Sequence, residues 1–186
     1  MRSDQQKELL SAVRGYLEHK LCGEKHPELS KDPFYEKELG LFVTLHMHGA
    51  LRGCIGYIRG FKPLKHALFE MADAAAFQDH RFMPLIESEL DEIEIEISIL
   101  SELTGIADYH DIVIGIDGIF LKQGHKQAVF LPQVAPEQGW DLETTLKHLC
   151  RKAGLSSNAY KDRKTSFEVF QADVFSEEKT SHKATK

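Results

Sequence analysis

The fold is decided by the stretch Leu41-Phe42-Val43-Thr44-Leu45-His46-Met47-His48-Gly49-Ala50-Leu51-Arg52-Gly53-Cys54-Ile55-Gly56. Its first part is a short apolar run with the period of a strand, and a second such run extends from Leu51 to Ile58. The segment between them, His48-Gly49-Ala50, is short enough for a hairpin turn. The stretch therefore predicts two antiparallel strands joined as a hairpin.

Outside this hairpin, three segments carry apolar residues every three to four positions, which predicts three helices. The first carries the apolar positions from Leu9 to Leu21. The second begins at Pro63, a residue that suits the first turn of a helix. The third follows the capping residue Asp141 and stops at Gly154.

The plainest strand is Glu92–Ile99, in which four isoleucines alternate with Glu92, Glu94, Glu96 and Ser98. Alternation places the isoleucines on a core face and the polar residues on the opposite face. A second hairpin is predicted from Gly118–Lys122 and Gln127–Leu131, and a last strand at Ser166–Phe170. Strands that are grouped, and that do not alternate strictly with helices, favour an α+β fold with a largely antiparallel sheet and flanking helices.

The domain organisation is predicted to be one domain over residues 1–175. The loop around residues 101–115 suggests a division into a larger lobe and a smaller lobe at about residues 101–140. Residues 176–186 are polar and lysine-rich, a composition typical of a disordered tail.

Composition limits the classes of protein to which the chain belongs. The chain has 29 acidic and 23 basic residues, a formal charge of −6 and a pI near 5.9. This balance argues against a dedicated duplex-DNA binder, which needs a basic face. No run approaches the roughly 20 apolar residues that span a bilayer, and the first residues lack the apolar region of a signal peptide. Three cysteines without a CxxC motif indicate reduced thiols, so we expect a cytoplasmic protein.

Cys54 is the first candidate for chemistry. Strict alternation along its strand would place Arg52, Cys54 and Gly56 on one face, and a guanidinium beside a thiol favours the nucleophilic thiolate. Gly53 and Gly56 lack side chains where a ligand or another backbone can approach closely. The alternative interpretation is a small buried thiol in a sheet whose glycines admit a helix. The residues alone leave both interpretations open.

Arg81 and Glu96 are further candidates. Arg52 and Arg81 together would clamp a carboxylate or phosphate, because a guanidinium offers a planar fork of donors. The alternative for Arg81 is a structural ion pair with Asp79 or with a glutamate. If the polar face of Glu92–Ile99 meets Cys54, Glu96 would act as a general acid or base and Ser98 as a hydrogen-bond partner. The alternative is a solvated face.

Metal and cofactor motifs give a weaker signal. His46 and His48 lie on one strand face as a candidate metal pair, but nothing nearby has the spacing of further ligands. The sequence lacks HExxH, P-loop, GxSxG and strand-linked GxGxxG motifs. We therefore predict neither a bound metal nor a cofactor.

Several separate motifs together resemble the AMMECR domain family. The hexapeptide Leu51–Gly56 resembles its signature, and the resemblance continues through Ala74–Phe82, Glu96–Ser101, Phe130–Val134 and Leu149–Leu155. It covers roughly residues 5–175. One departure is Asp79-His80-Arg81-Phe82, where the family usually has Asp-Pro-Arg-Phe. Loss of the proline puts the placing of Arg81 in doubt, because the loop is less constrained.

The resemblance implies a larger sheet-and-helix lobe with a smaller one. It also implies a frequent genomic association with a radical-SAM protein and a Memo-family protein, the set called AmmeMemoRadiSam. It implies no assigned reaction. The leading hypothesis is a component of an enzyme system that binds a small anionic or nucleotide-like substrate in a cleft beside Cys54. In this hypothesis Arg52, Gly53, Gly56, Arg81 and Ser98 contact the substrate, Cys54 is the nucleophile and Glu96 handles protons.

Two alternatives remain open. One is a non-catalytic adaptor module for the radical-SAM and Memo-type partners. The other, less favoured by the acidic composition, is an RNA-binding domain.

Overall fold

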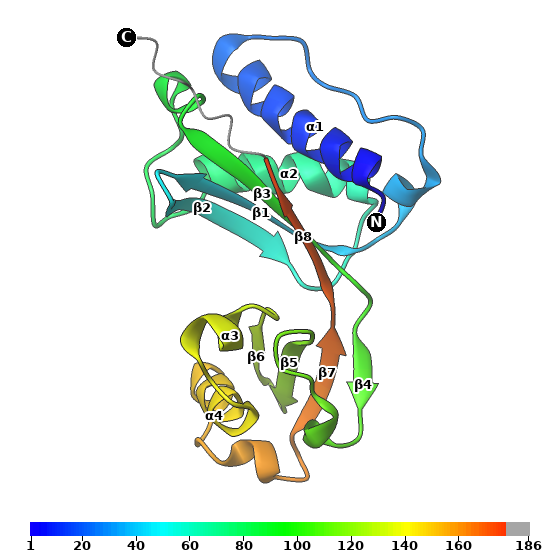
Figure 1. Ribbon diagram of the computed structural model, residues 1–186, viewed down its shortest axis with the longest axis vertical. Coiled ribbons are helices and arrows are strands. Elements are labelled where there is room, and N and C mark those ends of the chain that lie inside the picture. The colour runs from blue at the N-terminus through cyan, green and yellow to red at the C-terminus, as the bar shows by residue number, and fades with distance from the viewer. Residues whose placement is uncertain (178–186) are drawn as a thin grey trace. The chain divides into compact units, whose positions relative to one another are not determined.

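A computed structural model describes residues 1–177 of the protein (Figure 1). The chain divides into two compact units. Among the described residues, the first unit comprises Met1–Ile99 together with residues 173–177, and the second unit comprises Leu100–Ala172. Most of the predicted tail, residues 178–186, lies outside the described residues.

The first unit contains a four-stranded sheet in the order β2-β1-β3-β8. Its strands are β1 (Gly40–Met47), β2 (Ala50–Tyr57), β3 (Ile93–Leu100) and β8 (Ala172–Ser176), and its helices are α1 (Ser3–Cys22) and α2 (Leu64–Phe77). The predicted hairpin is β1-β2, and the plainest predicted strand is β3. In Figure 1 both helices lie on the same side of this sheet. Strand β2 has only β1 beside it, so it is an edge strand.

The hairpin turn has a backbone conformation that few residues adopt. His48 has φ 53° and Gly49 has φ 80°, and the pair Met47–Ala50 closes the turn. Positive φ at both central residues is the pattern of the two-residue type I′ turn, whose twist matches that of paired strands. The turn therefore sets the register in which β1 meets β2.

A β-bulge interrupts this register at Arg52. Leu45 pairs with Gly53 and His46 pairs with Leu51, so Arg52 has no partner on β1. An extra residue of this kind re-aims the side chains beside it. Side chains therefore alternate strictly between the two faces from Gly53 to Tyr57 but not across Arg52. The prediction that Arg52 shares a face with Cys54 and Gly56 assumed alternation along the whole strand, and the bulge breaks it.

The core of the first unit follows the predicted apolar periodicities. Leu41, Val43 and Leu45 of β1 are fully buried, and the isoleucines of β3 lie in the same cluster. The helices contribute Leu9 and Val13 from α1, and Leu68 and Ala75 from α2, among others. The buried apolar area stabilises this layer of helices on one face of the sheet and leaves the other face to polar side chains.

The sequence did not predict the last strand, β8. Its residues are mostly exposed, so its apolar pattern is weak. Glu177 follows it and joins β3, with its backbone N–H donating to the Ile95 carbonyl at 3.0 Å and its carboxylate accepting from the Ile95 N–H at 3.0 Å. Arg14 also donates to this carboxylate.

The second unit contains another four-stranded sheet, in the order β4-β7-β5-β6. Its strands are β4 (Thr104–Ile106), β5 (Gly118–Gln123), β6 (Lys126–Phe130) and β7 (Ser166–Phe170), and its helices are α3 (Val134–Gln138) and α4 (Leu142–Lys152). Asp141 caps α4 as expected, since its carboxylate accepts from the Thr144 N–H at 2.8 Å. Helix α3 is not among the three helices that the sequence predicts.

The α+β class with largely antiparallel pairing is confirmed, with two sheets in place of the single sheet that was expected. No helix within residues 1–177 is long and apolar enough to cross a membrane.

Candidate functional site

The face of the first sheet opposite α2 carries the predicted chemistry, and we call it the polar face. Thr44 and His46 of β1 point to it, because they alternate with the buried Leu41, Val43 and Leu45. Cys54 of β2 lies directly opposite Thr44, whose hydroxyl donates to the Cys54 sulfur at 3.2 Å.

Glu96 of β3 also lies on this face, with Oε2 3.9 Å from Nε2 of His46. The polar face therefore brings together side chains from three adjacent strands.

The backbone of Cys54 is bound by two side chains from the loop after α2. Its N–H donates to Oδ2 of Asp79 at 3.0 Å, and its carbonyl accepts from Nη2 of Arg81 at 3.2 Å. These two groups lie along the outer edge of β2, where another strand would pair. An unpaired strand edge is a template for unwanted pairing. Asp79 and Arg81 therefore bind the backbone groups of Cys54 that another strand would otherwise pair with at the edge of β2.

Asp79 is the centre of this arrangement. Its buried carboxylate accepts from the Cys54 N–H and from three groups of Arg81: the backbone N–H at 3.2 Å, Nε at 2.9 Å and Nη2 at 2.6 Å. The Arg81 guanidinium, followed by the two backbone N–H groups, holds the pKa of Asp79 well below its usual range, although burial opposes the shift. Asp79 is thus a carboxylate at any pH at which the protein would work.

Arg81 is held in place and is still accessible. Its hydrogen bonds to Asp79 raise the pKa of its guanidinium, and 55% of its side chain is exposed. Within residues 1–177, its Nη1 has no hydrogen-bond partner. The fork of Asp79 thus fixes one edge of the guanidinium and leaves the other free to donate. The pairing of Arg81 with Asp79 was one of the two interpretations that the sequence left open.

The loop keeps its turn without the proline that the family usually has there. The Phe82 N–H donates to the Asp79 carbonyl at 3.0 Å, which closes a four-residue turn with His80 at its second position. The Arg81 N–H bond to the Asp79 side chain reinforces it. Without the proline, Arg81 is held in place by its hydrogen bonds to the Asp79 carboxylate, which restrict the loop as a proline would.

Replacing His80 by proline is expected to raise the free energy of unfolding by about 0.4–1 kcal/mol. His80 is exposed, has a negative φ, and its N–H makes no hydrogen bond within residues 1–177. Proline suits the second position of such a turn and restricts the unfolded chain. Urea unfolding followed by circular dichroism measures the change. A loss of stability would show that the His80 backbone does not have the conformation proline requires.

Arg52 makes a separate ion pair. Its Nε and Nη2 donate to the two carboxylate oxygens of Glu89 at 2.9 and 2.8 Å, and only 8% of the residue is exposed. The pair lowers the pKa of Glu89. The structure therefore does not bring the guanidinium groups of Arg52 and Arg81 to one partner, because the bulge aims Arg52 at the segment that contains Glu89.

The two glycines of the hexapeptide are sites of close packing. A Cβ on Gly53 would lie 2.2 Å from the backbone oxygen of Ala75 in α2. A Cβ on Gly56 would lie 2.2 Å from the Leu41 oxygen and 2.5 Å from the ring of Phe42. Gly53 thus faces the helix, on the side of the strand away from the Cys54 thiol.

Glu96 and Ser98 lie on β3, with β1 between them and Cys54. Two strand spacings separate β3 from β2, which is about 10 Å. Glu96 is therefore too far for direct proton exchange with the thiol. Ser98 is 3% exposed and lies deeper in the layer than Glu96.

The two candidate metal ligands do not share a partner. His46 lies beside Glu96, whereas His48 lies in the turn with its Nε2 2.8 Å from Oε2 of Glu92. Among residues 1–177, no three His, Cys, Asp or Glu side chains form a group that fits a metal ion.

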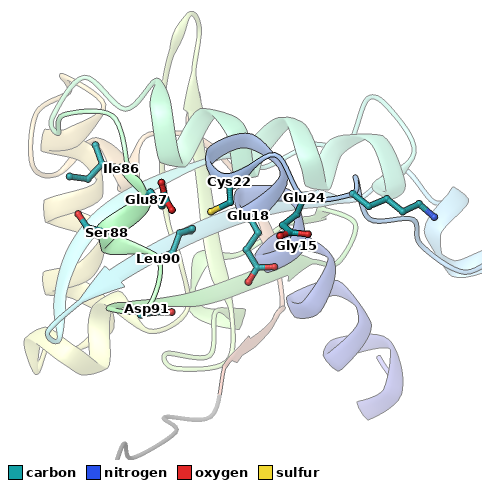
Figure 2. A pocket seen from close by; sticks show the side chains of 10 residues that line it. Gly15, Glu18, Cys22, Glu24, Ile86, Glu87, Ser88, Leu90 and Asp91 are labelled. Atoms are coloured by element: carbon teal, nitrogen blue, oxygen red, sulfur yellow. The ribbon is translucent and has the colours of Figure 1, made fainter.

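A cavity of about 1040 Å³ lies elsewhere in the first unit, between α1 and the segment 86–91 (Figure 2). It contains none of the predicted site residues; its lining includes Glu18, Cys22, Glu24, Glu87 and Asp91. Partial desolvation raises the pKa of the Cys22 thiol, and neighbouring carboxylates raise it further. Cys22 is thus exposed but unfavourably placed for thiolate formation, and Cys150 is fully buried.

Sequence reasoning missed two contributors to the site. Thr44 was treated only as part of a strand, although its position opposite Cys54 follows once the turn type sets the register. Asp79 was considered only as a partner of Arg81. The signal that it also binds the strand edge was absent, because the contact joins residues 25 positions apart.

Comparisons with known proteins agree with this fold. The family model AMMECR1 matches residues 10–175. A protein from Methanothermobacter thermautotrophicus is 40% identical over 183 residues, which cover 94% of this chain and 95% of that protein. Protein MJ0810 from Methanocaldococcus jannaschii is 38% identical, with 89% of this chain and 86% of that protein covered.

A solved structure is similar over almost the whole chain. The crystal structure of the uncharacterized protein PH0010 from Pyrococcus horikoshii has a TM-score of 0.80 and 33% identity, and the match covers 91% of this chain and 90% of that one. The match of the family model to most of the sequence, together with these relatives, assigns the chain to a family. The protein belongs to the AMMECR1 family.

Proposed function

We propose that the polar face beside Cys54 binds a small anionic substrate, with Arg81 as the residue that holds the anion. The observation that carries this proposal is the state of Arg81: its guanidinium is fixed by Asp79 next to the Cys54 backbone while more than half of its side chain is exposed. A cation fixed before binding loses little conformational freedom when an anion arrives. A guanidinium also suits carboxylate and phosphate groups geometrically.

The other predicted contacts take different roles in this proposal. Arg52 is buried and paired with Glu89, so it supports the strand and has no exposed edge to hold the anion. Gly53 and Gly56 allow close packing, and Ser98 is buried beneath the face. Cys54 and Thr44 remain beside the anion, which places a thiol where the substrate would lie.

The wider setting is also part of the proposal. The resemblance to the AmmeMemoRadiSam proteins supports work alongside radical-SAM and Memo-family partners as one component of an enzyme system. The three free cysteines, Cys22, Cys54 and Cys150, support a reducing, cytoplasmic location. The adaptor and RNA-binding interpretations stay predictions without a structural observation in their favour.

Inorganic phosphate and AMP are the probes that test the anion site. Titration followed by NMR should shift the backbone signals of Cys54 and Arg81. Replacing Arg81 by glutamine is expected to weaken binding about 10-fold or more, since one charge-assisted hydrogen bond contributes roughly 1.5–3 kcal/mol. Arg81→Lys should give an intermediate loss, because lysine keeps the charge without the fork.

Arg163→Gln is the matched control, because Arg163 is an exposed arginine of the second unit. It should leave the titration unchanged. Circular dichroism of each variant checks that the fold is retained. Equal binding by the wild-type protein and Arg81→Gln, or equal losses in Arg81→Gln and Arg163→Gln, would remove Arg81 as the anchor.

A further inference from the structure

The polar face carries a row of three groups that the proposed function does not use together: Cys54 on β2, His46 on β1 and Glu96 on β3. We infer that His46 is the proton acceptor for the Cys54 thiol, with Glu96 orienting the imidazole, and that the site takes an anionic substrate with an electrophilic carbon. The inference deepens the proposed function and rests on it for the anion. It adds a residue that was considered only as a metal ligand.

The first step of the argument is the register of the hairpin. Thr44 lies directly opposite Cys54, and His46 is the next residue of β1 on the same face, towards the turn. His46 and Cys54 are therefore diagonal neighbours, about 7–8 Å apart in the backbone and within reach of an aromatic side chain.

The pairing of Cys54 with Thr44 brings side chains of the polar face close together. The Cys54 N–H and carbonyl point outward to Asp79 and Arg81, so Cys54 and Thr44 are a pair without mutual backbone hydrogen bonds, in which side chains lie closer. The imidazole of His46 is long enough to reach across the diagonal to Cys54 on the same face.

The second step is the position of Glu96, which lies beside the ring nitrogen Nε2 of His46. Oε2 of Glu96 lies 3.9 Å from Nε2 of His46. The carboxylate occupies the Nε2 side of the ring and leaves Nδ1 for the thiol. The side chains of His46 and Glu96 are 31% and 28% exposed, so both are partly shielded but open to a small molecule.

The remaining charged groups complete the surroundings of His46. Glu94 shares its strand face with Glu96, and the pair His48–Glu92 lies towards the turn. The Thr44 hydroxyl donates to the Cys54 sulfur at 3.2 Å. Arg81, at the outer edge of β2, donates to the Cys54 carbonyl at 3.2 Å.

The chemistry that follows is balanced without a further reagent. The thiol proton passes to His46, and the sulfur forms a bond to the electrophilic carbon of the substrate. The bond from that carbon to the leaving group breaks, and the leaving group departs with the electron pair. The imidazolium then returns its proton to the leaving group or to water. Arg81 holds the anionic end of the substrate during this step.

Iodoacetamide and iodoacetate test the two parts of the site separately. Both alkylate a thiolate with loss of iodide, but only iodoacetate is an anion. The reaction is followed by mass spectrometry of the Cys54 peptide in a Cys22→Ser background, with Cys150 fully buried. Rates are measured from pH 5 to pH 10.

His46→Gln is expected to lower both rates at pH 7 by about 10-fold or more and to leave one rise at alkaline pH, because the proton acceptor is lost. Glu96→Gln should lower both rates less. His48→Asn is the matched control, since asparagine tolerates the positive φ of this position, and it should change neither rate. Arg81→Gln should lower the iodoacetate rate more than the iodoacetamide rate.

The outcomes separate the inference from the proposed function. The role of His46 is overturned if the alkylation rates are unchanged in His46→Gln, or if His46→Gln and His48→Asn lose equally. This holds whatever the result for Arg81→Gln. Equal effects of Arg81→Gln on both reagents count against the anion site alone. If His46→Gln does not fold, NMR titration of the His46 ring decides: its midpoint should move between the wild-type protein and Cys54→Ser, and identical midpoints reject the inference.

Discussion

Replacing Gly53 by alanine is expected to lower the free energy of unfolding by about 2–3 kcal/mol, the upper part of the range for overpacking a filled core. The new Cβ would lie 2.2 Å from the backbone oxygen of Ala75, and a helix backbone cannot move aside as a flexible side chain can. Helix α2 must therefore separate from β2, and the contacts between them weaken. Urea unfolding followed by far-ultraviolet circular dichroism measures the loss.

Gly15→Ala is the matched control in the same unit. A Cβ there would meet Pro27 at 3.5 Å, which is ordinary contact, and Gly15 lies inside α1. Alanine is preferred to glycine in a helix by about 1 kcal/mol, so this variant should gain stability. Cys54→Ser should change stability little, since serine can keep the hydrogen bond with Thr44. A Gly53→Ala variant as stable as the wild-type protein would contradict the packing role of this glycine.

Replacing Asp79 by asparagine is expected to destabilise the protein by about 2–3 kcal/mol at pH 7, because buried donors lose a charged acceptor. The carboxylate serves four donors, among them the Cys54 N–H at 3.0 Å. An amide cannot accept all four, so the edge of β2 and the guanidinium of Arg81 both lose a partner. The same variant should also weaken phosphate binding, because Arg81 is no longer fixed.

The pH dependence of this loss has a definite sign. The folded-state pKa of Asp79 is depressed, chiefly by Arg81, so its stabilising contribution is present above its unfolded pKa of about 3.9 and is lost as the pH falls below that value. The difference between the wild-type protein and Asp79→Asn should therefore be constant from pH 7 to about pH 5 and shrink towards pH 3. Exposed Asp91 gives the control variant Asp91→Asn, for which no such change is expected. If the stability difference between the wild-type protein and Asp79→Asn stayed the same down to pH 3, Asp79 would not be the ionised acceptor described above.

The first prediction concerns a residue of the hexapeptide Leu51–Gly56, and the second concerns Asp79, which binds the backbone of the hexapeptide at Cys54. The residues of the hexapeptide have different roles. Gly53 packs against helix α2 and Arg52 forms an ion pair with Glu89. Cys54 points to the polar face of the sheet. A signature of this kind combines close packing with the group that we propose for chemistry. Loss of activity in a glycine or arginine variant would consequently say nothing about the thiol, and only Cys54→Ser addresses it directly.

The sequence by itself determined the elements with strong periodicity. Four elements follow from patterns that each span only a few neighbouring residues, and the structure confirms them. They are the strand Glu92–Ile99, the hairpin around His48-Gly49, the capped helix after Asp141 and the strand Ser166–Phe170. Local patterns predict local structure because alternation, capping and turn conformation depend on neighbouring residues alone. Strand β8 escaped prediction because its stability comes from pairing with β3 and not from its own pattern.

Only the tertiary structure decided the site. The sequence predicted Cys54, Arg81 and Glu96 as candidates and paired Arg52 with Arg81, but the bulge at Arg52 and the position of Glu89 separate those two guanidinium groups. Asp79 binds the Cys54 backbone across 25 positions, and a contact over that span leaves no periodic trace in the sequence. The hairpin register places His46 diagonally from Cys54 for the same reason: side chains are neighbours according to strand pairing, which the order of residues along the chain does not show.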